Sequence, residues 1–185
     1  LGRLPSVTFS SQDMALVRGD PAERRTFLDT SLSQLYPGYL QHLANYKRAL
    51  EQRNVLLRAA QEQNVPDDQF EIWEADMAQH GALLRHRRKQ YVLDLHGYGG
   101  PILCGLEPGE SLAIEYEAKD RHADHEALAS ALSEGRREEI RRGTSLIGPH
   151  RDDLALSING YRTRTFGSQG QQRSVALSLK MASLK

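Results

Sequence analysis

Two stretches of apolar residues, spaced alternately by three and four positions, constrain the fold of this chain more than any other feature. The first begins after Pro37 and the second after Pro66, and the break at residues 64–67 separates them. Such spacing is typical of helices that pack along a coiled-coil seam, and a short turn between them predicts an antiparallel hairpin. The predicted seam positions are Tyr39, Leu43, Tyr46, Leu50, Leu57 and Ala60, then Phe70, Trp73, Met77, Leu84 and Tyr91, with Arg53, His80 and Arg87 as polar interruptions.

Glycine and proline at residues 96–101 predict the end of this hairpin and the return of the chain to another part of the fold. Strands are predicted at residues 6–9, 111–118 and 154–158, where apolar and polar residues alternate. Asn159 and Gly160 favour a type I′ turn into a partner strand at residues 161–165. Helices are predicted from Pro21, after Asp20 as its N-cap, and over residues 124–142. The fold class is therefore mixed α/β.

The composition excludes several classes of protein. The chain has 185 residues, enough for one domain or two small ones, and its 24 basic and 24 acidic side chains cancel. Any nucleic-acid surface must therefore arise from local clustering of charge. A single cysteine, Cys104, excludes an internal disulfide framework and fits a reducing cytoplasm, and it is predicted to be a small buried residue. No apolar run has the length of a membrane span or a signal peptide.

Residues 166–185 carry the clearest candidate site. Ser168 and Gln171 form an S-x-x-Q capping box at the start of a helix that places Val175, Leu179 and Ala182 on one face. A helix N-terminus offers free N–H groups and partial positive charge, and Gly170 allows an anion to approach closely. Ser168, Gln171 and Arg173 add side-chain donors, so the segment is either a phosphate site or an ordinary capped helix after a turn.

Other polar clusters leave two interpretations open. Arg85, Arg87, Arg88 and Lys89 lie in the densest positive run, which is either a solvated helix face or a contact to DNA phosphates. Residues 148–153 include His150, which with the neighbouring aspartates is either an acid–base pair or turn chemistry. The arginines of residues 136–142 are interpreted as an exposed mixed face. No histidine has the companions of a metal site.

Three blocks of the sequence resemble the RecF family of bacterial recombinational repair. They are F-S-S-Q-D-M-A-L-V-R-G-D-P-A-E-R-R-T-F-L-D at residues 9–29, G-P-H-R-D-D-L at 148–154 and G-S-Q-G-Q-Q-R-S-V-A-L-S-L-K at 167–180. Their order and spacing also match, and the resemblance covers essentially the whole chain. RecF resembles SMC proteins in its ABC-type ATPase head and has a short helical arm instead of a long coiled coil. The resemblance thus implies an incomplete ATPase head with an inserted antiparallel helical hairpin.

The family's functional positions can be transferred residue by residue. The segment with Ser168, Gln169, Gly170, Gln171, Gln172 and Arg173 is similar to the ABC signature motif, which contacts the γ-phosphate of ATP held by the other subunit of a dimer. Gln12 is the candidate for the Q-loop position. No G-x-x-x-x-G-K-[ST] phosphate loop (Walker A) occurs, and no apolar strand ending in acidic residues (Walker B) follows the signature helix. Without the lysine, the Mg²⁺ ligands and the catalytic carboxylate, the segment is expected to be inactive alone.

The resemblance implies an internal fragment of a cytoplasmic, ATP- and Mg²⁺-dependent, dimerising DNA clamp. Its implied roles are DNA replication, recombinational gap repair and the SOS response, with mediator proteins of the RecO and RecR type as partners. The implied division is a head segment at 1–36, the arm at 37–100 and a return to the head at 101–185. Two other functions stay open: a non-enzymatic hairpin that binds DNA, and an arm that binds other repair proteins.

Overall fold

The computed structural model describes residues 10–185, so the strand predicted at residues 6–9 lies outside the described part. The chain divides into two compact units. The sheet unit contains the described residues up to Ser31 with Lys89–Glu117 and Asp153–Lys185, and the hairpin unit contains Leu32–Arg88 and Ala118–Asp152. The division at 36 and 100 implied by the family resemblance stays a prediction.

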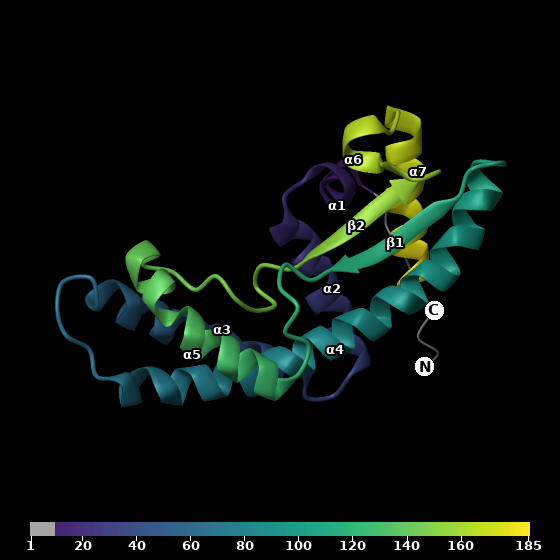
Figure 1. Cartoon of the computed structure of the whole chain (residues 1–185). Helices are drawn as coiled ribbons and strands as arrows, with labels where there is room; N and C mark the ends of the chain where they lie inside the picture. The colour runs from purple at the N-terminus through teal and green to yellow at the C-terminus, as the bar shows by residue number, and fades with distance from the viewer. Residues whose placement is uncertain (1–9) are drawn as a thin grey trace. The chain divides into compact units, whose positions relative to one another are not determined.

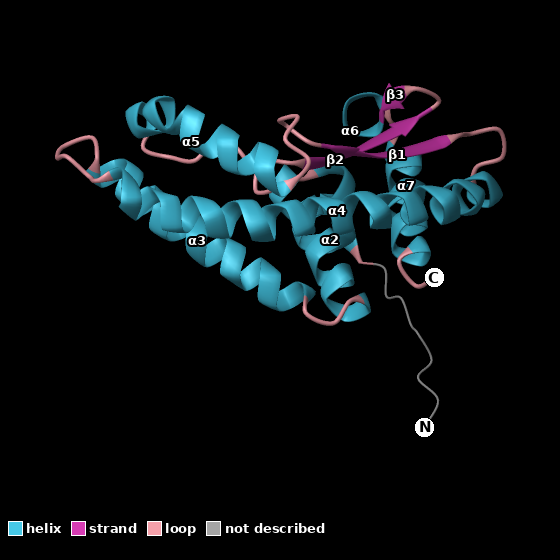
Figure 2. Cartoon of the chain, turned by 60° about the horizontal axis from the view of Figure 1, so that its bottom comes forward, coloured by secondary structure: helices cyan, strands magenta, loops and turns pink. Residues whose placement is uncertain are grey.

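An antiparallel sheet in the order β1-β2-β3 organises the sheet unit; Figure 1 labels β1 and β2, and Figure 2 labels all three strands. β1 (Leu112–Glu117) pairs along its whole length with β2 (Asp153–Ile158). Asn159 and Gly160, which follow β2, have φ angles of 50° and 83°. These left-handed values are the ones that a two-residue type I′ hairpin requires. The two predicted strands and the Asn-Gly turn are confirmed.

The partner strand is shorter than predicted. β3 covers only Tyr161–Arg162, and a single helical turn, α6 (Thr163–Phe166), follows it (Figure 2). The predicted strand to residue 165 is wrong because Thr163 leaves the ladder and becomes buried. Its carbonyl oxygen accepts hydrogen bonds from Gly167 N at 3.0 Å and Gln172 Nε2 at 3.1 Å. The backbone therefore turns away from β2 before the glycine loop begins.

Helices complete the core of the sheet unit. The 3₁₀ helix η1 (Ser11–Met14) leads into α1 (Ala15–Arg18), and α2 (Pro21–Leu35) begins at the predicted Pro21. α7 (Gln169–Ala182) buries the predicted face of Val175, Leu179 and Ala182. Apolar burial is the main stabilising contribution in such a core. Its other buried members include Val17, Leu28, Leu103, Ile114 and Leu156.

α4 (Asp67–Leu106) continues through residues 96–101, so the predicted end of the helix there is wrong. Pro101 lies inside the helix. A Cβ on Gly99 would come within 2.9 Å of Ile114 Cδ1, so the missing side chain leaves room for β1 against the helix. His96 Nδ1 also accepts the Ile114 N–H at 3.2 Å. These tertiary contacts outweigh the weak helix propensity of glycine. Cys104, predicted to be buried, is exposed on α4.

The hairpin unit contains α3 (Tyr39–Ala59), the first part of α4, and α5 (His125–Arg142), which lie side by side in Figures 1 and 2. α3 and α4 are antiparallel, since His42 contacts His80 at 2.9 Å while Arg53, further along α3, bonds Glu74. The predicted helical hairpin is confirmed. The seam residues buried in it are Tyr39, Leu43, Tyr46, Leu57, Phe70, Met77 and Leu84.

A buried charge network ties α3, α4 and α5 together. Arg53 is fully buried and donates to Glu74 Oε1, Ser145 Oγ and the Leu132 carbonyl oxygen. Arg136 of α5 donates to the same Glu74 carboxylate, with Nη2 2.6 Å from Oε2. Glu139 of α5 also pairs with Arg53 at 2.6 Å. The predicted exposed face is therefore wrong for Arg136 and Glu139, because their charges face the core.

Candidate functional site

The start of α7 has the predicted capping box. Ser168 lies at the N-cap, its Oγ accepts the Gln171 N–H at 3.2 Å, and Gln171 Oε1 accepts the Ser168 N–H at 2.7 Å. These bonds fix the backbone direction at the helix entry. The N–H groups of Gln169 and Gly170 belong to the first turn, where no intrahelical acceptor is available. The helix therefore presents two backbone donors beside Ser168.

Two glutamates from the loop after α4 hold this helix start, and the sequence did not predict them. Glu110 Oε1 accepts from Gln171 Nε2 at 2.7 Å. Glu107 Oε1 accepts from the Ser174 hydroxyl, also at 2.7 Å. The four residues are far apart in the chain, and no short-range pattern connects them. The glutamates accept from the Gln171 and Ser174 side chains and leave the Ser168 end of the helix exposed.

Gln172 differs from the other members of the motif because its side chain is buried. Its Nε2 donates to the Thr163 and Gly167 carbonyl oxygens at 3.1 and 3.0 Å, and its Oε1 accepts from Arg18 Nε. These bonds join α1, α6 and α7. Gln172 therefore positions the glycine loop and has little capacity left for a ligand.

The two glycines of the loop have different roles. A Cβ on Gly167 would lie 2.7 Å from the Thr163 carbonyl oxygen, closer than folded proteins tolerate. A Cβ on Gly170 would meet only Ser168 Oγ, at 3.8 Å. Packing thus requires glycine at 167 but not at 170, where glycine costs the helix about 1 kcal/mol relative to alanine. Ser168, Gln169, Gly170 and Arg173 are all exposed, so a ligand can reach the bare backbone at Gly170.

Replacing Gly167 with alanine is expected to destabilise the sheet unit by about 1–3 kcal/mol, because the added methyl overpacks against Thr163. Gly170→Ala is the matched control and is expected to be neutral or slightly stabilising. Thermal unfolding followed by circular dichroism measures both variants. Equal melting temperatures for the two variants would contradict the difference in packing.

Gln12, the candidate for the Q-loop position, lies in η1. Its neighbour Asp13 is tied to α7 by Lys180, with Nζ 2.8 Å from Oδ1. Burial opposes ionisation of Asp13, but hydrogen bonds from Lys180 and Ser10 outweigh it and keep the pKa of Asp13 below its ordinary value. This pair anchors the segment that carries Gln12 to the signature helix.

Comparison with known proteins finds no matching family model. The DNA replication and repair protein RecF of Roseiflexus castenholzii is 40% identical over 198 residues, which covers 100% of this chain and 50% of the relative. RecF of Chloroflexus aurantiacus is 42% identical over 193 residues and covers 98% of the chain and 49% of the relative. A solved structure of the recombination mediator protein RecF–ATP in the RecFOR pathway has a TM-score of 0.88 at 31% identity, covering 95% of this chain and 49% of that one.

The chain belongs to the RecF family. It spans about half the length of the curated RecF relatives that it matches. The structural match confirms the predicted fold, part of an ABC-type ATPase head with an inserted helical hairpin.

The positive run at residues 85–89 does not face solvent as a whole. Arg85 is buried and donates to Asp152 and Asp120, and Arg88 is buried and donates to the Pro149 carbonyl oxygen at 2.8 Å. The contact of DNA with Arg85 and Arg88 stays a prediction, and their burial argues against it because each guanidinium would have to leave its partners to reach a phosphate. Arg87 lies over the Tyr36 ring at 4.7 Å, and Lys89 is exposed.

The His150 imidazole contacts Tyr46 and Ser145. His150 Nδ1 lies 2.7 Å from the Tyr46 hydroxyl and its Nε2 lies 3.2 Å from the Ser145 carbonyl oxygen. Burial raises the pKa of Tyr46 well above its ordinary value, so the hydroxyl stays protonated. The Ser145 carbonyl oxygen can only accept, so Nε2 carries the proton and Nδ1 of the neutral imidazole accepts from the Tyr46 hydroxyl. Asp152 bonds Arg85, and Asp153 bonds Arg24. The segment links secondary structures through separate polar contacts.

Two further features of the described residues bear on the site. No group of three or more histidine, cysteine, aspartate or glutamate side chains among them is arranged to hold a metal ion. None of the helices in residues 10–185 combines the length and the apolar character needed to cross a bilayer.

Proposed function

We propose that this chain is part of a RecF-type DNA replication and repair protein, and that the start of α7 contacts the terminal phosphate of ATP bound by a second subunit. The observation that carries the proposal is the exposed backbone at Gly170, where glycine has no packing role. Beside it stand the Ser168 hydroxyl and the first-turn N–H groups. A helix N-terminus with these donors favours a phosphate oxygen.

The residues of this chain have distinct proposed tasks. Ser168 and the N–H groups of Gln169 and Gly170 bind the phosphate, while Arg173, exposed on the first turn, adds positive charge. Gln171 and Gln172 hold the loop through Glu110, Thr163 and Gly167. Bound ATP with Mg²⁺ would supply the negative charge that this helix end attracts.

Hydrolysis would require further parts of a RecF-type protein. The sequence has no phosphate loop with its lysine, which cradles the nucleotide phosphates in enzymes of this type. We therefore propose that the chain alone is inactive and that ATP closes a homodimer of the longer protein. Such a nucleotide-dependent clamp fits gap repair and the SOS response, with RecO- and RecR-type mediators as partners.

Substitutions of Ser168 test the site. In a protein with the full length of its relatives, Ser168→Asp keeps a good N-cap but places a negative charge against the phosphate. We expect nucleotide binding to persist while ATP-dependent dimers, measured by light scattering, are lost. Ser168→Arg blocks the site by size and is expected to give the same result. Ser168→Thr, which keeps the cap and the hydroxyl, is expected to dimerise.

The matched control is Ser133→Arg, which makes the same change on the exposed surface of α5. ATP-dependent dimers of Ser168→Arg at the level of this control would refute the proposed contact in trans. Loss of dimers in Ser133→Arg as well would indicate a general effect of added charge.

A non-enzymatic hairpin that binds DNA through residues 85–89 is a weaker candidate. Of the arginines and lysine in that run, Arg87 and Lys89 lie outside the core, and two cations make a small contribution to phosphate binding.

A further inference from the structure

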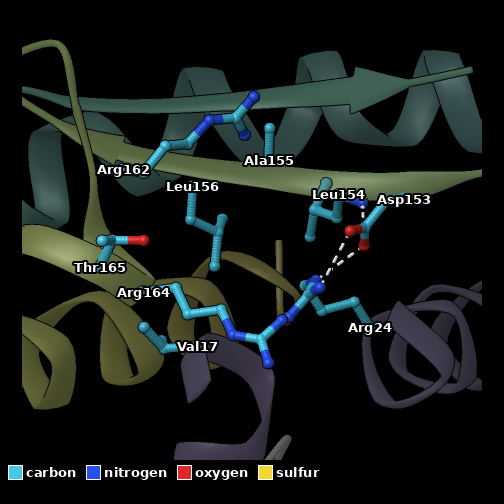
Figure 3. A pocket seen from close by; sticks show the side chains of 9 residues that line it. All are labelled: Val17, Arg24, Asp153, Leu154, Ala155, Leu156, Arg162, Arg164 and Thr165. Carbon is cyan, nitrogen blue, oxygen red and sulfur yellow. Dashed lines mark hydrogen bonds and ion pairs between the residues drawn. The ribbon is translucent and has the colours of Figure 1, made fainter. Parts of the chain in front are cut away.

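A cavity lies beside β2. It has a volume of about 150 Å³ and shares no residue with Ser168–Arg173. Figure 3 shows the apolar Val17 and Leu156 and the charged Arg24, Asp153 and Arg164 around it. The complete lining is Val17, Arg24, Asp153, Leu154, Ala155, Leu156, Arg162, Arg164 and Thr165.

The ion pair of Arg24 and Asp153 forms one side of the cavity. Arg24 Nε and Nη2 donate to the two carboxylate oxygens of Asp153 at 2.7 and 2.9 Å, and Arg24 Nη1 donates to the Gly19 carbonyl oxygen at 2.8 Å (Figure 3). Asp153 also accepts the Leu154 N–H at 2.7 Å. Both charges are thus neutralised in place, and the pair holds the shape of the cavity.

Arg164 is not matched in this way. The carboxylate paired with it, Asp20, lies 3.6 Å away, and the Asp20 side chain is 84% exposed to solvent. A pair of this length and exposure neutralises little charge. Thr165 adds a hydroxyl on the same side of β2 as Arg164 (Figure 3). Arg24 and Asp153 neutralise each other, so Arg164 keeps an excess positive charge beside the cavity.

Arg162 lines the cavity but points elsewhere. Its guanidinium lies on the opposite side of β2 from Arg24 and Arg164 in Figure 3, and it pairs with Glu117 of β1. Arg164 is therefore the cation of the lining that can offer its fork of donors to a ligand in the cavity.

We propose that this cavity is a second phosphate-binding site, in which Arg164 forms a forked contact to phosphate oxygens and Thr165 donates its hydroxyl. A guanidinium matches the geometry of phosphate, which accepts two parallel N–H bonds. Compared with inorganic phosphate or a phosphate monoester, a carboxylate offers fewer oxygens and less charge. The phosphate can come from a nucleic-acid backbone or from a small phosphate compound.

Arg164→Gln and its control Arg162→Gln test the site in the intact protein. Both changes remove one charge from the same hairpin, but only Arg164 faces the cavity. Titration with inorganic phosphate, followed by the arginine Nε–Hε NMR signals, is expected to shift the Arg164 signal in the wild type. Phosphate binding is expected to weaken about tenfold in Arg164→Gln. Thr165→Val, which leaves every charge in place, is expected to weaken binding by a smaller factor.

Salt-dependent binding to a short DNA duplex identifies the source of the phosphate. A nucleic-acid backbone in the site predicts that Arg164→Gln lowers the slope of log affinity against log salt by about 1, and that Arg162→Gln does not. An unchanged slope together with weaker inorganic phosphate binding assigns the site to small phosphate compounds. Arg164→Gln and Arg162→Gln with equal affinities for both probes would overturn the proposal.

Discussion

Arg85→Met is expected to destabilise the hairpin unit by about 3–5 kcal/mol, the usual cost of stranding buried charges. Arg85 Nε and Nη2 donate to Asp152 at 2.7 and 2.9 Å, and Nη2 also donates to Asp120 at 2.7 Å. Asp152 is fully buried. Methionine fills a similar volume but supplies no donor, so two carboxylates lose their shared cation inside the unit.

The pH dependence identifies the cause of this loss. Burial opposes ionisation of Asp120, but bonds from Arg85 and the Gly148 N–H outweigh it and hold the pKa of Asp120 below its ordinary 3.8. Its contribution to wild-type stability is present above about pH 4 and is lost as the pH falls through the lowered pKa. In Arg85→Met the guanidinium no longer lowers this pKa, so Asp120 binds a proton at higher pH than in the wild type and protonation relieves the stranded charge. The difference in the free energy of unfolding between the wild type and Arg85→Met should therefore become smaller below about pH 4.

Urea denaturation followed by the fluorescence of Trp73, the single tryptophan, measures this effect within the hairpin unit. The control is Arg137→Met, the same change at an exposed position of α5. Adding Asp120→Asn and Asp152→Asn to Arg85→Met should restore part of the stability. If Arg85→Met loses no more stability than Arg137→Met, the buried ion pairs of Arg85 contribute little to the stability of the unit.

Arg53→Met is expected to cost about 3 kcal/mol or more for a related reason. The guanidinium pairs with Glu74 at 3.0 Å and with Glu139 at 2.6 Å, and all three side chains are buried. Glu74 keeps its bonds to Arg136 in the variant. Glu139 loses the guanidinium and keeps the hydrogen bond that it accepts from the Leu146 N–H. We therefore expect its buried charge to account for most of the lost stability.

Arg136→Met is the graded comparison. Its partners are Glu74, which Arg53 still holds, and Asp67, whose side chain is 80% exposed. The decrease in the free energy of unfolding should be clearly smaller for Arg136→Met than for Arg53→Met in the same denaturation experiment. Glu139→Gln should recover stability when added to Arg53→Met. If the two arginine variants lose equal stability, the stranded charge of Glu139 is not the main cause.

The sequence located most helices and strands because their signals are local. The helical hairpin, the Asn159-Gly160 turn and the capping box of Ser168 each depend on residues within a few positions of one another. Local signals misled where a distant element decided the outcome. Glycine and proline predicted the end of α4 at residues 96–101, but contact with Ile114 keeps the helix intact there.

The burial of charged residues also depends on distant parts of the chain. The spacing of residues 85–89 does not distinguish a solvent-facing run from one that meets Asp120 and Asp152, because both carboxylates come from a later part of the chain. The cavity with Arg164 was missed for the same reason, since its lining comes from α1, α2, β2, β3 and α6.

Local sequence patterns were sufficient to predict the seam of the hairpin and the capped start of α7, and three motifs were sufficient to predict the family. Helical periodicity and capping are set by interactions within one or two turns, which short patterns record. The burial of Gln172 and Arg85 and the exposure of Gly170 and Arg164 could be seen only in the folded chain. Burial and ion pairing depend on which distant groups meet, and neighbours in sequence do not specify that.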